Sequence, residues 1–237
     1  VGTDDGNVQV SKDAGKTWNE VGQNVQGLPS NSYVSRVLAS KKGRSISYVT
    51  FDRHREGDWR PYVFKTEDYG QSWIALHNDL PSGSINVIVE HPDNPDVLFI
   101  GTENSVFVSV NGGSGWTRLK SNLPTTLYDD MVIHPREKDL ILGTHGRSFW
   151  VLDDTTPFVE WNQSENNNLF LFSIRPATLF YYWKDTSYRG QEEWVGPNPP
   201  YGALINFVVN SDADSAKITI SRKKKTVREY KVAVNKG

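Results

Sequence analysis

Short apolar stretches alternate with polar turns along the first 155 residues, at the spacing of β-strands rather than of helices. The clearest set of strands is predicted at 85–90, 97–101, 106–110 and 116–119. A second set repeats this pattern at 131–133, 140–143 and 148–152. No apolar period of 3.6 residues is visible anywhere. The alternation therefore predicts an all-β fold without helices.

One eight-residue pattern, S/T-x-D/N-x-G-x-T/S-W, occurs at 11–18, at 66–73 and, with glycine at its seventh position, at 109–116. Its Asp or Asn side chain can bond back to the backbone of its own turn, and its glycine supplies a positive φ. The tryptophan begins the return strand, so we expect all three tryptophans in the core. The positions predicted to be structural are Ser11, Asp13, Gly15, Trp18, Thr66, Asp68, Gly70, Trp73, Ser109, Asn111, Gly113 and Trp116.

Other landmarks repeat in phase with this pattern. His91-Pro92 and His134-Pro135 lie 43 residues apart, as do Asp68 and Asn111. A period of about 40–45 residues with short strands is typical of β-propeller blades. One unit is about ten residues longer than the others, and its extra residues fall in the polar segment 52–59, which is predicted to be a loop. A β-sandwich with coincidentally similar turns is the alternative.

The repeats predict a partial β-propeller of about three to four blades over residues 1–155. Because a closed propeller has about four to eight blades, we expect further N-terminal blades of the same polypeptide. Residues 156–168 are predicted to be a linker. Residues 169–237 contain predicted strands at 204–209, 217–221 and 227–234, which is the pattern of an incomplete Ig-like β-sandwich. The basic run 222–225 is expected to be a solvated hairpin tip, with an anionic partner as the alternative.

The composition excludes several classes of function. The formal net charge of −2 gives no electrostatic reason to expect nucleic-acid binding. No apolar run reaches 18 residues, so no membrane span is expected. There are no cysteines, and no metal-ligand spacing or phosphate-binding loop is present. We therefore expect neither a metal nor a cofactor.

The eight-residue pattern resembles the Asp-box, or BNR repeat, of sialidases, xyloglucanase-type glycosidases, photosystem assembly propellers and sortilin receptors. Residues 142–154 resemble the closing blade of large bacterial exported proteins with sortilin-like propellers. In those proteins, segments resembling 171–177 and 198–203 lead into a C-terminal Ig-like domain. The resemblance implies a secreted or periplasmic protein. It also implies that the Asp-box lies at a rim hairpin, away from the channel, which makes its aspartates structural.

Propellers bind ligands at the channel mouth, where loops enter the innermost strands. Asp129 and Asp130, at one of these entries, are the strongest catalytic candidates, since two carboxylates can serve as acid and base in glycoside hydrolysis. However, adjacent residues of a strand point to opposite faces, which favours a turn-capping or channel-solvating role. The ligand-binding candidates are Tyr33, Arg36, Asn86, Tyr128, His145 and Arg147.

The function expected from these residues is binding of a protein, peptide or glycan ligand at the propeller face, without a complete catalytic site in this chain. The alternative is a sialidase- or xyloglucanase-like glycoside hydrolase whose site is completed by other blades. The three arginines and the Tyr–Glu pair of a sialidase cannot be assembled from these residues. A purely structural scaffold is the third possibility.

Overall fold

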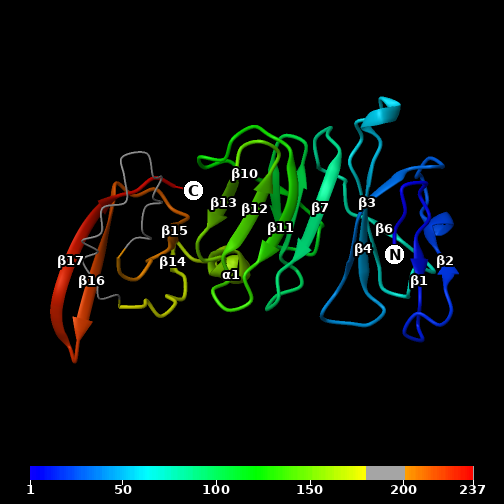
Figure 1. Ribbon diagram of the computed structural model, residues 1–237. Coiled ribbons are helices and arrows are strands. Elements are labelled where there is room, and N and C mark those ends of the chain that lie inside the picture. The colour runs from blue at the N-terminus through cyan, green and yellow to red at the C-terminus, as the bar shows by residue number, and fades with distance from the viewer. Residues whose placement is uncertain (180–200, 237) are drawn as a thin grey trace, which may run out of the picture. The chain divides into compact units, whose positions relative to one another are not determined.

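The computed structural model describes residues 1–179 and 201–236, and it divides into two compact units, Val1–Asn162 and Gln163–Gly237. The first unit is built from antiparallel sheets (Figure 1). Its strands are β1 (Gln9–Val10), β2 (Asn19–Glu20), β3 (Tyr33–Ala39), β4 (Ser47–Asp52), β5 (Tyr62–Thr66), β6 (Ile74–Ala75), β7 (Ile85–Glu90), β8 (Leu98–Thr102), β9 (Val106–Ser109), β10 (Thr117–Leu119), β11 (Tyr128–Ile133), β12 (Leu140–Thr144) and β13 (Phe149–Leu152). The all-β prediction is confirmed.

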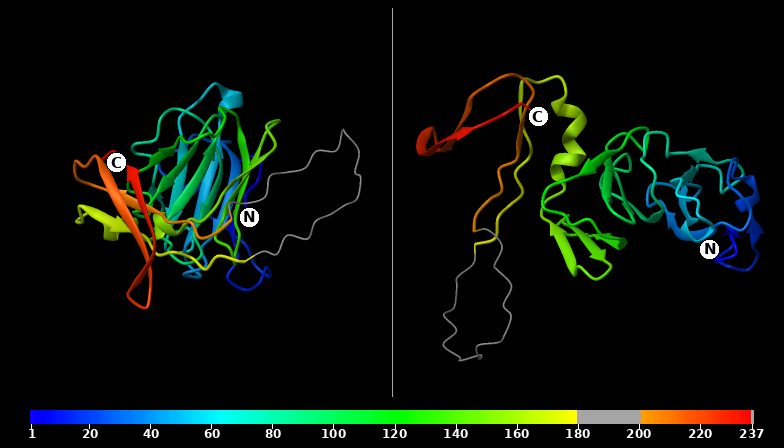
Figure 2. Two further views of the ribbon diagram at one scale, coloured as in Figure 1. Left: turned by 90° about the vertical axis from the view of Figure 1, so that its left-hand side faces the viewer. Right: turned by 90° about the horizontal axis from the view of Figure 1, so that it is seen from above.

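Each repeat folds as a meander whose strands pair in chain order. β3–β6 and β7–β10 form four-stranded sheets, and β11–β13 form a three-stranded sheet. β1 and β2 pair as a short hairpin that the Gly2–Val8 bridge extends. The first strands of the three larger sheets, β3, β7 and β11, lie side by side (Figure 1), and Figure 2 gives two further views of these sheets. The predicted strands agree with these bounds to within three residues.

Three apolar clusters lie between successive repeats. Phe99 of β8 packs toward the sheet of β11–β13, whereas its neighbours Leu98 and Ile100 pack toward the sheet of β3–β6. Because both faces of such a strand are buried, its residues form an uninterrupted apolar run rather than a polar alternation. The core is thus shared between sheets.

Tryptophans of the eight-residue turns join one repeat to the preceding one. The indole Nε1 of Trp73 donates to the carbonyl of Val21 at 3.1 Å, and that of Trp116 donates to the carbonyl of Leu76 at 2.6 Å. Trp18, in the first copy, donates instead to Gly15 of its own turn, and 47% of its surface is exposed. The prediction of a core position is wrong for Trp18, because its indole bonds within its own turn instead of to another repeat.

Carboxylates organise the first two turns. Asp13 accepts from the backbone N–H and the hydroxyl of Thr17 at 2.8 and 2.7 Å, and Asp68 accepts the same two bonds from Ser72 at 2.9 and 2.6 Å. These bonds favour the ionised form and lower the pKa of each carboxyl to about 2. In the third turn, Asn111 accepts only a backbone N–H at the seventh position, from Gly115 at 2.9 Å.

Helix α1 (Thr156–Ser164) occupies most of the segment predicted to be a linker, so the expectation of a helix-free chain is wrong. Asp154 accepts from the N–H of Thr156 at the helix start, and Pro157 fits the first turn, where a missing N–H leaves no bond unmade. The ring of Phe158 packs edge-on against Phe99, with centroids 5.5 Å apart. A helix of nine residues makes only two to three turns, too few to display a clear apolar period.

The described part of the second unit contains two antiparallel pairs. β14 (Leu169–Leu171) pairs with β15 (Phe207–Val209), and β16 (Ser215–Arg222) pairs with β17 (Lys225–Ala233). The basic run forms the β16–β17 turn, in which Lys223 and Lys224 both have positive φ, the signature of a type I′ hairpin. Residues 198–200 of the segment quoted for the family resemblance lie outside the described residues. The Ig-like sandwich stays a prediction.

His91 links the β7–β8 turn to the end of β13. Its Nδ1 accepts from the N–H of Asp93 at 3.1 Å, and its Nε2 lies 3.0 Å from the hydroxyl of Thr155. That hydroxyl donates to the carbonyl of Lys138, so His91 Nε2 must be the donor to it. The contacts therefore fix the neutral Nε2–H tautomer, since a proton on Nδ1 would displace the Asp93 bond. Burial further lowers the pKa of His91.

We expect the free energy of unfolding to fall as the pH drops below about 6.5, where histidine in the unfolded chain becomes protonated. The fall should continue down to the lower pKa of folded His91. The sign follows because the unfolded chain then binds a proton that the folded chain excludes. His91→Asn should flatten the urea-unfolding free energy between about pH 7 and pH 5. His134→Asn, in the same repeat slot, is the control. Equal pH dependence of the wild type and His91→Asn would contradict this assignment.

Candidate functional site

The pairing registers separate the two ends of each sheet. Tyr33 at the start of β3 lies opposite Asp52 at the end of β4, whereas Ser47 at the other end of β4 lies opposite Thr66, which begins an eight-residue turn. The same relation holds for β7–β9. The loops that enter β3, β7 and β11 therefore share one end of the sheets, here called the mouth face. The eight-residue turns lie at the opposite end.

Each innermost strand is irregular at the same repeat position. The registers shift between Val34 and Arg36, between Ile85 and Val87, and between Tyr128 and Asp130. The residues skipped by the pairing are Ser35, Asn86 and Asp129. Bulges re-aim side chains and are common beside functional sites. Sequence alternation alone could not reveal them.

The bulges bring charged groups of different repeats together on the mouth face. Arg36 of β3 donates to Asp130 of β11 at 2.5 Å, so the pair spans the intervening strand β7. His145, in the β12–β13 loop, lies 3.5 Å from Asp129. Both pairs remain accessible, and the side chain of Asp130 is 68% exposed. Arg36, Asp129, Asp130 and His145 therefore form one polar cluster.

Asp129 and Asp130 both lie on the exposed side of β11. They stand between the buried Tyr128 and Met131, so the usual alternation of faces is interrupted at this point. The register shift supplies the reason, because a bulge places two residues opposite one. The expectation that these carboxylates point to opposite faces of the strand is wrong. Both can reach solvent at the mouth.

Several polar atoms beside the charged pairs have no hydrogen-bond partner among the described residues. They are Nε of Arg36, Nδ2 of Asn86 and Oγ of Ser84. Buried donors without partners are uncommon in folded proteins, so each calls for an explanation, and a ligand that accepts from them is one such explanation. Asn86 lies on β7, between the strands that carry Arg36 and Asp130. Its amide is a donor that the fold itself does not use.

The remaining candidates differ in their access to a ligand. Tyr128 is fully buried, and its hydroxyl donates to the carbonyl of Pro124 at 2.7 Å, so its side chain supports the mouth without lining it. Tyr33 is 43% exposed on the mouth face. Arg147 is exposed in the β12–β13 loop, where its carbonyl accepts from Trp150. No bond between its side chain and the polar cluster is seen among the described residues.

Trp59 is a mouth residue that the sequence interpretation missed. It lies in the loop between β4 and β5, the segment that lengthens its repeat, and it is 44% exposed. Its carbonyl accepts from the N–H of Gly83 at 2.7 Å and from the hydroxyl of Ser82 at 3.0 Å. The insertion is therefore fastened to the loop that enters β7. The added length, with one tryptophan in an otherwise polar stretch, was the signal available in the sequence.

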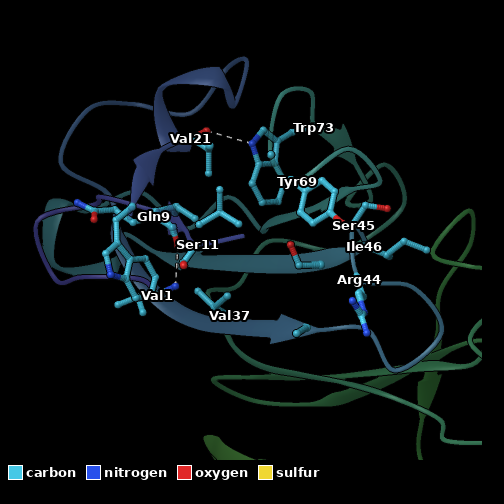
Figure 3. Close-up of a pocket in the computed structure, with 16 residues that line it drawn as sticks. Val1, Gln9, Ser11, Val21, Val37, Arg44, Ser45, Ile46, Tyr69 and Trp73 are labelled. Atoms are coloured by element: carbon cyan, nitrogen blue, oxygen red, sulfur yellow. Dashed lines mark hydrogen bonds between the residues drawn. The ribbon is translucent and has the colours of Figure 1, made fainter. Parts of the chain in front are cut away.

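A separate groove of about 260 Å³ lies beside Val1, between the first repeat and the sheet of β3–β6 (Figure 3). Its walls are mainly apolar and include Val10, Val37, Tyr69 and Trp73. No cluster of three or more acidic or histidine side chains suited to a metal ion occurs among residues 1–179 and 201–236. The titratable groups brought together by the inner strands make the mouth face the stronger candidate site.

No protein-family model and no curated protein matches the chain. Among solved structures, the chain is similar to a GH74 enzyme from Niastella koreensis, at 17% identity with a TM-score of 0.52, over 65% of this chain and 26% of the enzyme. The fold is a partial β-propeller. The GH74 xyloglucanase from Xanthomonas campestris has 18% identity and a TM-score of 0.49, over 63% and 24% of the two chains. YCF48 bound to D1 peptide has 18% identity and a TM-score of 0.47, over 65% and 47%.

This partial propeller spans about a quarter of the length of the two GH74 enzymes. Each four-stranded sheet is one blade, and the innermost strands β3, β7 and β11 are the channel-facing strands of three consecutive blades. Within the described residues, no helix is long and apolar enough to cross a membrane.

Proposed function

We propose that the chain is a ligand-binding part of an exported Asp-box propeller of the sortilin-like bacterial type, followed by the start of an Ig-like domain. The ligand, a protein, peptide or glycan, binds at the mouth face. The observation that carries this proposal is the Arg36–Asp130 pair, which joins the first and third inner strands across Asn86. Fixed, accessible charges beside unused donors are the groups that orient a ligand.

The distribution of polar groups supports binding at the mouth rather than at the turns. The carboxylate oxygens of Asp13 and Asp68 accept hydrogen bonds from within their own turns. Asp129 and Asp130 instead reach partners on other segments through exposed contacts that a ligand can replace or extend. A secreted or periplasmic location belongs to the same proposal.

An array of glycans and peptides probed with the labelled 237-residue chain tests this function. Specific hits are expected, and Asp130→Ala should weaken them about ten-fold, because it removes a charged contact and leaves Arg36 unpaired. Asp96→Ala is the control, since Asp96 lies in the β7–β8 turn at the opposite end of its blade. Absence of specific hits would instead support a purely structural scaffold.

A glycoside hydrolase of the xyloglucanase or sialidase type is the second candidate function. The bulge that exposes both Asp129 and Asp130 favours it, because two accessible carboxylates are the minimum set for acid–base cleavage of a glycosidic bond. In this case, other blades would complete the site. Hydrolysis of a polysaccharide by the full-length protein, abolished by Asp129→Asn or Asp130→Asn with folding retained, would establish this alternative over simple binding.

A further inference from the structure

Three loops of two adjacent blades meet beside Trp59. The β4–β5 loop is fastened to the entry of β7 through the Trp59 carbonyl, as described above. At the other side of that entry, the N–H of Glu103 donates to the carbonyl of Ser84, and a carboxylate oxygen of Glu103 lies 3.5 Å from where a Cβ of Gly83 would be. The Trp59 loop and the Glu103 carboxylate therefore flank the same short segment.

The rings of Trp59 and Tyr33 are exposed in this region, and each lies about 6 Å from a neighbouring basic side chain. The imidazole of His54 lies 6.1 Å from the Trp59 ring, inclined by 32°. The guanidinium of Arg55 lies 6.0 Å from the ring centre of Tyr33. The backbone of Trp59 is hydrogen-bonded to the next blade, so the loop that carries its ring is fixed in position.

Carboxylates of two blades lie near the His54 imidazole. Asp52 accepts from the backbone N–H of His54 at 2.9 Å and pairs with its Nδ1 at 2.6 Å. The carboxyl of Glu103 comes from the next blade. Burial, followed by the negative charge of Asp52, raises the pKa of Glu103. Asp52 and Glu103 are therefore close enough to interact. Asp52, whose side chain is only 13% exposed, orients His54, and the Glu103 carboxylate is the acceptor left for a ligand.

The charges around Trp59 are of both signs and largely paired. Arg53 and Arg60 both lie within ion-pair distance of Asp58, at 3.4 and 2.7 Å, and Arg55 lies over the Tyr33 ring. An ion of either sign therefore meets no excess of the opposite charge. An uncharged ligand with one apolar face and several hydroxyl groups can instead use the aromatic surface and a carboxylate acceptor.

We infer that the Trp59 platform, defined as Trp59, Tyr33, His54, Asp52 and Glu103, binds a pyranose ring of a neutral oligosaccharide. The C–H face of the sugar stacks on Trp59, and one of its hydroxyls donates to the Glu103 carboxylate, while Asp52 orients His54. Tyr33 extends the apolar surface, and the exposed imidazole of His54 offers a further polar contact. This inference rests on the proposed ligand binding at the mouth face and names the class of ligand.

Calorimetric titration of the 237-residue chain with cellotetraose and with maltotetraose tests the inference, with tetragalacturonate as an anionic probe of equal length. At least one neutral tetrasaccharide should bind. Trp59→Ala should weaken that binding about ten-fold or more, because the stacking surface is lost. Trp18→Ala is the matched control: Trp18 is equally exposed, lies on an eight-residue turn, and should leave the affinity within about two-fold.

Trp59→Phe should retain most of the affinity if the ring provides a stacking face. Equal losses in Trp59→Ala and Trp18→Ala, or preference for tetragalacturonate, would overturn the inference. Failure of both neutral sugars to bind would also overturn it. In that event, a peptide hit on the array that depends on Asp130 would still uphold the proposed function, so the two failures are distinguishable.

Discussion

Replacing Gly70 with alanine is expected to lower the free energy of unfolding by about 3 kcal/mol. Gly70 has a φ of +83°, and a Cβ at this position would lie 2.6 Å from Cγ2 and 2.7 Å from Cβ of Val21. The left-handed backbone costs alanine about 1 kcal/mol, and overpacking adds roughly 1–3 kcal/mol. Since Val21 belongs to the preceding repeat, the clash acts on blade-to-blade docking.

Gly57→Ala is the matched control for Gly70→Ala. Gly57 also has a positive φ, +69°, but nothing lies within 4 Å of its would-be Cβ. This variant should lose only the backbone contribution of about 1 kcal/mol. Urea unfolding of both variants measures the difference. Equal destabilisation would show that the eight-residue turn does not pack against Val21.

Gly101→Ala is expected to cost about 2–3 kcal/mol for a purely steric reason. Its Cβ would lie 2.6 Å from Cε of Met131, 2.7 Å from Cγ1 of Val87 and 2.9 Å from Cβ of Tyr128. Met131 and Tyr128 belong to the next blade, and all three side chains are buried. Of these neighbours, only the end of Met131 can move readily, so the strain cannot be relieved at one contact.

Gly143 occupies the same slot in the following repeat and provides the control. Its nearest contact is the carbonyl of Asp130 at 3.5 Å, which is an ordinary packing distance. Gly143→Ala should therefore be neutral or stabilising by about 0.5 kcal/mol, because alanine restricts the unfolded chain. Thermal unfolding compares the pair. A Gly101→Ala variant as stable as Gly143→Ala would contradict the packing of β8 against β11 of the next blade.

The repeat architecture could be predicted from the sequence because its determinants are local. The eight-residue turns need their carboxylate, hydroxyl and glycine within one hairpin, and the structure has Asp13 and Asp68 bonded as that pattern predicts. The exposure of Trp18 could not be predicted in this way. It depends on whether another repeat lies against the ring, which no pattern within the turn records.

The candidate site was predicted less completely. Tyr33, Arg36 and Asp130 were found because the repeat places inner-strand entries at one end. The bulges were missed because they interrupt the alternation used to assign faces, so Asp129 and Asp130 were expected on opposite sides. Trp59 was missed because an insertion has no counterpart in the other repeats. Its position depends on bonds to Ser82 and Gly83 at the entry of the next blade.

Hydrogen–deuterium exchange with and without a ligand identified on the array tests the central claim, that the mouth face binds the ligand. Added protection is expected at the β3 entry, in the β4–β5 loop and at the β11 entry. The eight-residue turns at 11–18, 66–73 and 109–116 should exchange unchanged. Protection confined to those turns, or to the groove beside Val1, would contradict the account.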